Sequence, residues 1–496
     1  MNIETMTSSE INEFFKNQTV FLLGGTGFLG KIVIEKLLRL DQIAKIYILV
    51  RPKKGKSVDE RFCELFNFPC FERLKNKNPQ FGKKIALVSG DCEQPNLGIS
   101  QETEDVLIAE TSIVIHAAAN VKFDQPLRTA TYINVRSTQD CIHLAKKMPN
   151  LKAFIYVSTA YSNCPYFDID ETFYEPAMTP KNLLSVVDSL DDKTLDKVTP
   201  GLMGKWPNSY VFTKTIAEDL IKSEEKNLPI AIVRPAVIMS SVKEPMPGWI
   251  DSFYGITGVT VAIALGVVRS LYCQKNATVH LVPCDYVCNI ILASAWHVGQ
   301  QKSRTLTIYN YVGSNTNAVT WQKYNDLIER CAWDYPTTKA VWYYGFAFTD
   351  NKFYHDLQTF LFHTVVFSLV DFILQCMGKK PIAVQNIKRL DLALNLVTYF
   401  TINSFSFKHD NVDKLWKQMN DQDKNLYSFD MSTLDWSSYI RSFVIGGRVY
   451  LLKDPLETIP EGHKKVQFLA VAYYFTMGVL ICLIYFFIKF VLKLVL

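Results

Sequence analysis

The sequence predicts an α/β protein: a doubly wound, Rossmann-type parallel sheet, then a mostly helical C-terminal domain and a C-terminal transmembrane helix. Three observations lead to this fold class. Short apolar runs alternate with helical patterns up to about residue 295, as in sheets that are covered by helices on both faces. A glycine-rich turn follows the first run. A long uncharged segment near the C-terminus is typical of a membrane helix.

Six apolar runs are the predicted strands. The first, TVFLL at 19–23, precedes the turn GGTGFLG at 24–30, after which KIVIEKLLRL has a helical pattern. The other five are 45–50 (KIYILV), 84–91 (KIALVSGD), 112–119 (SIVIHAAA), 153–159 (AFIYVST) and 230–236 (IAIVRPA). Such continuous apolar runs are typical of parallel strands that are buried on both faces. RTLTIYNYVGS predicts a late additional strand.

Composition excludes several classes of protein. The chain has 496 residues, which suggests more than one domain, and its net charge of +5 includes no long basic block, so nucleic-acid binding is not expected. Its 11 cysteines form no C-x-x-C pair. Neither a disulfide framework nor a metal site is therefore predicted, and the thiols suit a reducing, cytosolic environment.

We expect five divisions along the chain, and the first is not a signal peptide because it has no apolar core. They are a polar N-terminal tail (1–15), a dinucleotide-binding domain (16–295), a connecting segment with a late strand and helices (296–352), a C-terminal domain (353–455) and a transmembrane anchor (466–488).

The predicted anchor has no charge in 23 residues. At about 1.5 Å per residue it can cross a hydrocarbon core of about 30 Å. Lys464 and Lys465 precede it, and tyrosines lie near its ends. The alternative is a buried core helix. We expect a tail-anchored protein whose body faces the cytosol, on either the endoplasmic reticulum or the peroxisome.

A second apolar stretch, 353–378, contains His355, Asp356, His363 and Asp371. These polar groups argue against a spanning helix, so we expect a helix that is docked in a core or lies on the membrane. Phenylalanines of this stretch are candidates for the wall of an apolar substrate channel, with an ordinary helical core as the alternative: Phe353, Phe360, Phe362, Phe367 and Phe372.

The turn between the first strand and the first helix has glycines at 24, 27 and 30. Glycine is required where the backbone turns tightly and approaches a pyrophosphate at a helix N-terminus. NAD-binding proteins have an acidic residue about 20 residues later. Arg51 occupies that place here and Lys53 follows. Because cations attract a 2′-phosphate, we expect NADP rather than NAD, with a solvated basic loop as the alternative.

Polar and small residues follow the later strands, at the sheet edge where open α/β sheets bind ligands. Asp91 ends the third strand and can meet the adenine amino group, and Ala117 and Ala118 allow a close approach to the cofactor. Ser158 and Thr159 end the fifth strand.

NSYVFTK places Tyr210 four residues before Lys214, on the same face of a predicted helix. The pair alone fits either an ordinary surface contact or a proton-handling centre. Together with the glycine turn and with Ser158 or Thr159, it predicts an enzyme.

These motifs resemble an extended short-chain dehydrogenase/reductase. More specifically, the chain is similar to the alcohol-forming fatty acyl-CoA reductases, which are related to the plant male-sterility proteins. The similarity covers nearly the whole chain and rests on GGTGFLGKIVIEKLLR, YILVRPKKG, HAAANVKFD, YVSTAYSN, PNSYVFTKTIAE, IVRPAVI, EPMPGWIDSFYG, VPCDYVCN, LFHTVVFSLVD, DWSSYI and GGRVYLLKD.

The resemblance implies a reaction in which long-chain acyl-CoA, two NADPH and two protons give a primary fatty alcohol, two NADP⁺ and CoA. Tyr210 would donate a proton to the carbonyl oxygen, and Lys214 would lower the pKa of the phenol and hold the nicotinamide ribose. Thr159, which we prefer, or Ser158 would polarise the carbonyl. The implied cofactor-binding residues are Gly24, Thr26, Gly27, Phe28, Leu29, Gly30, Arg51, Lys53, Asp91, Cys92, Ala117, Ala118, Tyr210, Lys214 and Pro235.

The chain departs from the family pattern at three places. Leu23 replaces a threonine before the turn, Arg136 replaces a glycine, and the residues after His363 lack proline and alanine. The expected partners are the acyl-CoA and the lipid bilayer, and homo-oligomerisation stays open. Alternatives are an enzyme that stops at the aldehyde, a membrane-bound hydroxysteroid or sugar-nucleotide enzyme of the same superfamily, and a non-catalytic NADP-binding membrane scaffold.

Overall fold

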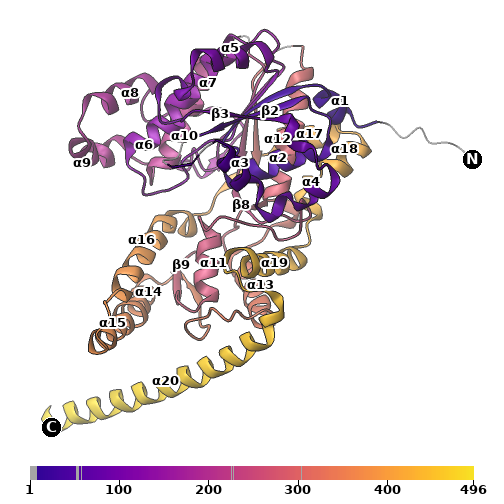
Figure 1. Cartoon of the computed structure of the whole chain (residues 1–496). Coiled ribbons are helices and arrows are strands. Elements are labelled where there is room, and N and C mark those ends of the chain that lie inside the picture. Colours follow the sequence, from indigo (N-terminus) through magenta and orange to yellow (C-terminus); the bar gives the residue numbers. More distant parts are fainter. Residues whose placement is uncertain are drawn as a thin grey trace, which may run out of the picture. The chain divides into compact units, whose positions relative to one another are not determined.

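A computed structural model describes residues 8–51, 55, 56, 58–224, 226, 228–302 and 304–495 (Figure 1). The chain forms two compact units that interleave in sequence. Unit 1 comprises Met1–Ile250, Thr278–Val319 and Asn403–Asp435, and unit 2 comprises Asp251–Ala277, Thr320–Ile402 and Trp436–Leu496. The expected consecutive domains therefore differ from the observed units, since the chain passes from one unit to the other five times.

Unit 1 is built on a seven-stranded parallel sheet in the order β11-β7-β5-β4-β1-β2-β3. All six predicted strands and the late additional strand belong to it, so the predicted doubly wound sheet is confirmed. The strands are β1 (Thr19–Leu23), β2 (Lys45–Val50), β3 (Ile85–Ser89), β4 (Ile113–His116), β5 (Ala153–Val157), β7 (Ile230–Pro235) and β11 (Thr307–Tyr311). Nearly all residues of the central strands are buried, as their apolar runs predict.

The order of the strands reverses at β1, which pairs with β2 on one side and with β4 on the other. Crossovers on either side of this point lead to opposite faces of the sheet, so the carboxyl ends of β1 and β4 border the crevice where such sheets bind ligands. Helix α12 packs on β5 and β7 and beside α2 on one face, whereas α7 packs on β4 and beside α10 on the other (Figure 1).

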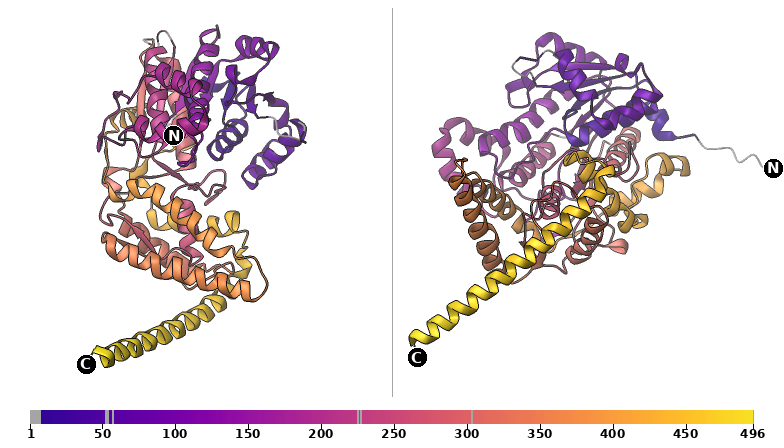
Figure 2. Two further views of the ribbon diagram at one scale, coloured as in Figure 1. Left: turned by 90° about the vertical axis from the view of Figure 1, so that its left-hand side faces the viewer. Right: turned by 60° about the horizontal axis from the view of Figure 1, so that its bottom comes forward.

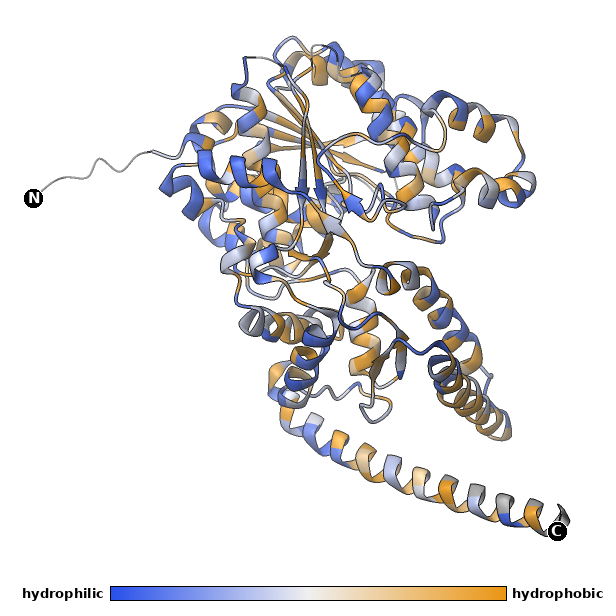
Figure 3. Ribbon diagram, turned by 180° about the vertical axis from the view of Figure 1, so that it is seen from behind, coloured by the Kyte–Doolittle hydropathy of each residue, from blue (hydrophilic) through white to orange (hydrophobic). Residues whose placement is uncertain are grey.

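The helices of unit 1 with eight or more residues are α2 (Phe28–Leu40), α3 (Val58–Phe66), α5 (Gln101–Glu110), α7 (Ser137–Lys146), α8 (Pro180–Ser189), α9 (Asp192–Met203), α10 (Ser209–Glu224), α12 (Cys284–Gln300) and α17 (Asp410–Gln418). The shorter ones are α1 (Glu10–Phe15), α4 (Glu72–Lys77), α6 (Leu127–Thr131) and α18 (Asp421–Leu426). Colouring by hydropathy shows apolar residues along the strands and on the helix sides that face them (Figure 3).

The chain returns to unit 1 after residue 402. Strand β13 (Ser406–Phe407) pairs with β6 (Asp168–Ile169), while β10 (Leu281–Pro283) pairs with β8 (Val237–Met239). The buried Asn310 amide donates to the carbonyl oxygens of Ile169 at 3.2 Å and Lys408 at 2.9 Å. This returning segment therefore completes unit 1, although the sequence placed it in a separate C-terminal domain.

The described start of the chain also differs from the expected polar tail. Ser9 caps α1 by accepting from the Asn12 amide, and Ile11 and Phe15 are buried. The Ser9 hydroxyl donates to Asp423 at 2.6 Å. The apolar residues at positions 11 and 15 lie one helical turn apart, which is the spacing that buries one side of a helix.

Unit 2 is mostly helical, as predicted. Its helices are α11 (Ile256–Ala264), α13 (Trp321–Asp334), α14 (Lys352–Thr359), α15 (Val366–Cys376), α16 (Ala383–Ile402), α19 (Trp436–Gly446) and α20 (Ile459–Val495), and its small sheet consists of β9 (Ser270–Tyr272) and β12 (Ala347–Thr349). A π-helical turn, η6 (Phe360–Val365), joins α14 to α15.

The predicted anchor lies within α20, a single helix of 37 residues (Figure 2). Its first turns pack in unit 2, where the Tyr473 ring stacks on Tyr343 at 5.4 Å and Lys465 donates to the Thr338 carbonyl at 2.7 Å. Within the residues that the structure describes, Lys352–Cys376 is long and apolar enough to cross a membrane, with a mean hydropathy of 1.7. Only 6 % of its most apolar window is buried, so it is not docked in a core.

Candidate active site

The glycine turn leaves β1 in a conformation that only glycine tolerates. Gly24 has a φ of +86°, and a Cβ there would lie 2.6 Å from the backbone of Ala117 and Ala118. A Cβ on Gly30 would lie 2.2 Å from the Gly24 carbonyl oxygen. These two glycines let β1, α2 and the end of β4 meet closely, as the sequence interpretation requires.

The N-terminus of α2 is open to a ligand. Gly27 is its N-cap, is exposed and makes no side-chain capping bond. The first amides of the helix are thus available to an anion, and the helix dipole favours a phosphate there. Thr26 is also exposed, while the Phe28 ring packs on Trp249 at 5.2 Å and Leu29 is half-buried. The turn therefore fits the pyrophosphate of a dinucleotide.

The residues that follow β2 and β3 meet at one loop cluster. Arg51 is exposed, and its guanidinium lies 4.0 Å from the Glu93 carboxylate. Arg136 packs over the Tyr132 ring at 3.6 Å and donates to the Glu93 carbonyl oxygen. The arginine that departs from the family pattern therefore lies in this cluster. Lys53 lies outside the described residues.

Asp91 and Cys92 lie directly after β3. The Asp91 carboxylate accepts from the Glu93 amide at 3.0 Å, which fixes the loop. Burial raises the pKa of the Cys92 thiol to about 12, so this thiol stays protonated and unreactive at neutral pH. Pro235 ends β7 opposite Tyr311 of β11 and is buried.

Lys214 is buried beneath the end of β5. Its ammonium donates to the Val157 carbonyl oxygen at 2.7 Å and to the Tyr156 hydroxyl at 3.1 Å. Only 1 % of the residue is exposed. Burial lowers the pKa of Lys214 to about 7, an effect that the negative charge of Glu218 opposes. This lysine is thus poised to exchange a proton near neutral pH.

Tyr210 lies one helical turn before Lys214, near the start of α10, where the Asn208 side chain accepts from the Val211 amide at 3.0 Å. Burial raises the pKa of the Tyr210 phenol to about 12, and a hydrogen bond with the Thr159 hydroxyl opposes that rise. The Tyr210 ring stacks on Phe123 at 5.9 Å. The structure therefore brings together Tyr210 and Thr159, but the polar contacts of Lys214 are with Tyr156 and Val157.

Ser158 faces a different group from its neighbour Thr159. The Ser158 hydroxyl donates to Glu218, and the Ser162 hydroxyl donates to the same carboxylate oxygen at 3.0 Å. Because Ser158 is used in this buried network, Thr159 is the better placed of the two hydroxyls to meet a carbonyl oxygen beside Tyr210.

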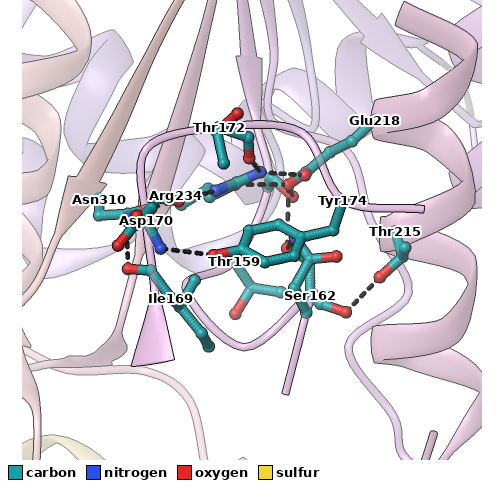
Figure 4. A network of polar contacts seen from close by, with 12 residues as sticks. Thr159, Ser162, Ile169, Asp170, Thr172, Tyr174, Thr215, Glu218, Arg234 and Asn310 are labelled. Carbon is teal, nitrogen blue, oxygen red and sulfur yellow. Dashed lines mark hydrogen bonds and ion pairs between the residues drawn. The ribbon is translucent and has the colours of Figure 1, made fainter. Parts of the chain in front are cut away.

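Arg234 completes the network and is fully buried (Figure 4). Its guanidinium donates to both carboxylate oxygens of Glu218, at 2.6 and 3.0 Å, and to the carbonyl oxygens of Asp170 and Thr172 at 3.1 and 2.9 Å. The pair therefore fixes the loop that follows β5 against α10 and β7.

Sequence reasoning missed this supporting pair. The signal was present, because Glu218 follows Lys214 by four residues on the same helix face and Arg234 lies in the last predicted strand of the set. It also missed Asn134, whose buried amide donates to Thr213 of α10 at 2.9 Å and whose oxygen accepts from the Asn120 backbone at 3.0 Å.

Comparisons with known proteins match most of the chain. Residues 22–291 match a family model for NAD binding that is described as male sterility protein, and residues 362–454 match a second model with the same description. The fatty acyl-CoA reductase wat of Drosophila melanogaster is 40 % identical over 95 % of this chain and 91 % of its own length. Human fatty acyl-CoA reductase 1 is 36 % identical over 92 % of this chain and 89 % of its own.

The chain belongs to the fatty acyl-CoA reductase family. Solved structures agree on the fold of this reductase. The terminal R domain of a myxalamid biosynthetic pathway has a TM-score of 0.58 and 20 % identity, over 89 % of this chain and 93 % of that one. The reductase domain of a nonribosomal peptide synthetase from Mycobacterium tuberculosis has a TM-score of 0.58 and 17 % identity, over 88 % and 93 %.

A nicotinamide cofactor fits the site of this reductase. The NAD-binding family model includes the glycine turn, Tyr210 and Lys214. The exposed, uncapped N-terminus of α2 and the small residues Ala117 and Ala118 beside it leave the backbone accessible to a dinucleotide. The second family model begins at Phe362 and includes the segment that returns to unit 1, so the two models together extend over both compact units.

Proposed function

We propose that this chain reduces long-chain fatty acyl-CoA to a primary fatty alcohol through an aldehyde, releases CoA and uses NADPH. Family membership supports the substrate class and the reduction. The observation that carries the catalytic assignment is the convergence of Tyr210, Thr159 and the buried Lys214 where β5 ends, on the sheet that bears the glycine turn.

Tyr210 is the proposed proton donor. When bound, the nicotinamide ring supplies a hydride to the carbonyl carbon, and negative charge then develops on the carbonyl oxygen. The Tyr210 phenol, whose pKa is raised to about 12, is fully protonated at neutral pH and can give its proton to that oxygen. The Thr159 hydroxyl, which already contacts the phenol, is placed to donate a second hydrogen bond to the same oxygen.

Lys214 is the proposed source of positive charge beside the phenol. Its pKa of about 7 means that both protonation states are populated near neutral pH. The cation stabilises a phenolate on Tyr210, which offsets the rise in the phenol pKa that burial causes. Neutral Lys214 would not stabilise the phenolate. Proton transfer through Tyr210 therefore depends on the protonated form of Lys214, which burial makes only partly populated near neutral pH.

The test of this function is product analysis. Membranes that contain the full chain would be incubated with NADPH and acyl-CoAs of increasing chain length, and the products identified by mass. We expect a primary alcohol of matching chain length and free CoA. Accumulation of aldehyde alone would show that reduction stops after one step, and products that are absent with every acyl-CoA would overturn the proposal. Membranes with Tyr210→Phe are the control.

The proposed preference for NADPH is supported by Arg51, which is exposed after β2, and by Lys53, two residues later in the sequence. Arg51→Ala together with Lys53→Ala should weaken NADPH binding by about 1.5–3 kcal/mol for each lost charged contact and leave NADH little changed. Glu93→Gln is the matched change with the opposite expected effect, because the Glu93 carboxylate lies 4.0 Å from the Arg51 guanidinium and competes with a 2′-phosphate for it. That variant should favour NADPH further. Equal effects on both cofactors, measured by titration, would exclude this loop as the reader of the 2′-phosphate.

We further propose that residues 466–488 of α20 anchor the reductase in a membrane with its body in the cytosol. The uncharged sequence and the continuous helix support this. Truncation after His463 should release the protein from membranes that are washed with alkaline carbonate. Retention in the pellet after that wash would require another spanning segment.

A further inference from the structure

The segment 352–389 of unit 2 presents an apolar surface that the chain itself leaves uncovered. Large side chains along α14, η6 and α15 are between 56 and 78 % exposed, namely Phe353, Phe360, Leu369, Phe372, Ile373 and Met377. With the exposed Leu357, Leu361 and Val365 between them, these residues recur at spacings of three or four and so form one stripe along the helix. Colouring by hydropathy shows this stretch as largely apolar (Figure 3).

The polar side chains of the same helix are turned toward the protein. His363 is buried and contacts the Asp391 carboxylate of α16 at 2.7 Å. Asp371 accepts from the Ala383 and Val384 amides at 2.8 and 2.9 Å and so caps α16. His355 contacts the Ser270 hydroxyl of β9 at 2.9 Å. Three of the four polar groups that argued against a spanning helix are therefore already satisfied within unit 2.

These inward contacts determine how the helix can meet lipid. They recur from His355 in α14 to Asp371 in α15, so the polar side of the helix is held by unit 2 along most of its length. Such a helix can offer its opposite side to a membrane but cannot be surrounded by lipid. An amphipathic helix of this kind lies in the plane of the interface, with its apolar side in the headgroup and acyl boundary.

The exposed charges around the stripe are mostly positive. Lys352 lies at its start, Lys379 and Lys380 lie in the loop between α15 and α16, and Lys388 and Arg389 follow on α16. The exposed acidic residue within this stretch is Asp356, which lies 3.7 Å from Lys352. The excess of cations complements an anionic lipid surface, to which each contributes about 1 kcal/mol.

We propose that residues 352–389 form a second membrane contact, separate from α20, that lies in the interface of an anionic leaflet. The surface is apolar where acyl chains would meet it and basic where phosphate headgroups would. The proposal does not depend on the reductase activity, because it rests on the exposed stripe, the inward polar groups and the basic rim.

A depth measurement on the full chain tests the contact. In a background in which the exposed cysteines Cys63, Cys376 and Cys482 are replaced by alanine, an environment-sensitive fluorophore is attached at Phe372→Cys, with Lys323→Cys on α13 of the same unit as the matched control. The protein is reconstituted through α20 into phosphatidylcholine–phosphatidylserine vesicles that carry nitroxide-labelled acyl chains. We expect quenching at position 372 to exceed that at position 323 by several-fold. Equal, weak quenching at both positions overturns the proposal.

The other occupants of such a surface give different results. If a second copy of the chain covers the stripe, the fluorophore at position 372 will have blue-shifted emission but will not be quenched by nitroxide lipid, which also overturns the proposal. Lys379→Glu with Lys380→Glu should reduce quenching at position 372 in phosphatidylserine-containing vesicles, whereas Lys323→Glu should not. Unchanged quenching in the double variant would show that Lys379 and Lys380 do not contribute to the contact with anionic headgroups. Thermal unfolding of each variant shows that unit 2 stays folded.

Discussion

Two buried cations of unit 1, Lys214 and Arg234, are held in opposite ways. Arg234 forms a bidentate ion pair with Glu218 and donates to two backbone carbonyl oxygens. Lys214 lies one helical turn before Glu218 and donates to one hydroxyl and one carbonyl oxygen. In the described part of the chain, no carboxylate forms an ion pair with Lys214.

The difference separates a structural charge from the one that we propose to act in catalysis. A guanidinium with a matched carboxylate is neutralised and fixed in geometry, so it holds the loop after β5 in place. An ammonium that is desolvated without a carboxylate partner is costly in its charged form, and the pKa of Lys214 accordingly falls to about 7. Such shifts cluster at catalytic sites because proton transfer needs groups that titrate near the working pH.

The largest expected effect is on the reaction rate and concerns Tyr210, the proposed partner of Lys214. Tyr210→Phe removes the proposed proton donor and keeps the ring that stacks on Phe123. Formation of alcohol and of aldehyde should both fall by roughly 10²–10⁴-fold, the usual contribution of a general acid. Rates with saturating NADPH and acyl-CoA provide the measurement, and thermal unfolding should show a protein as stable as the wild type. Turnover near the wild-type rate would exclude Tyr210 as the donor.

The second-largest expected effect is on stability and concerns the ion pair between Arg234 and Glu218. Glu218→Ala leaves Arg234 buried without its carboxylate and should lower the free energy of unfolding by about 3–5 kcal/mol. Glu224→Ala lies on the same helix and removes a partly exposed pair with Lys146, so it should cost less than about 1 kcal/mol. Urea unfolding of both variants gives the comparison. Equal losses would mean that burial does not distinguish the two pairs.

Two adjacent hydroxyls offer a sharper version of the comparison. Thr159 contacts Tyr210, and Ser158 contacts Glu218. Thr159→Ala should lower kcat by roughly 10²–10³-fold, as expected for the loss of a donor to a developing oxyanion, with little change in stability. Ser158→Ala should lower the free energy of unfolding by about 1–3 kcal/mol and leave kcat within a few-fold. The reverse pattern would assign the catalytic role to Ser158.

The sheet and the turn could be predicted because their signals are local. Parallel strands are continuous apolar runs, and Gly24 and Gly30 occupy positions where the backbone leaves no room for a side chain. The spacing of Tyr210 and Lys214 likewise follows from the helical repeat. The residue roles at the site remain predictions, which the substitutions above test.

The rest could not be predicted because it depends on contacts between residues that are distant in sequence. The return of 403–435 to unit 1 depends on strand β13 pairing with β6, more than 200 residues earlier. Phenylalanines 353, 360 and 372, which were candidates for an apolar channel, are exposed instead. Helical periodicity shows that one side of a helix is apolar, but it does not show whether protein or lipid covers that side.

The smallest expected effect concerns the dependence of stability on pH. The pKa of Lys214 is about 7 in the folded protein, compared with an ordinary value of 10.5. Between these two values the unfolded chain binds a proton that the folded chain does not, so stability rises with pH across this window. Below about pH 7 both states carry the proton, and the folded state bears the cost of the buried charge. Lys214→Met keeps the apolar stem and removes that cost.

The variant should therefore be more stable than the wild type at pH 6.5, and its advantage should shrink as the pH rises toward 9.5. Between about pH 6.5 and 9.5, the difference between variant and wild type in the free energy of unfolding should change by more than about 1 kcal/mol, since each unit of pKa shift corresponds to about 1.4 kcal/mol. Urea unfolding of both proteins at several pH values provides the measurement. If the variant and the wild type differ in their free energy of unfolding by the same amount at every pH, the Lys214 charge is compensated in the folded state as fully as that of Arg234. The contrast between the two buried cations would then be one of geometry alone.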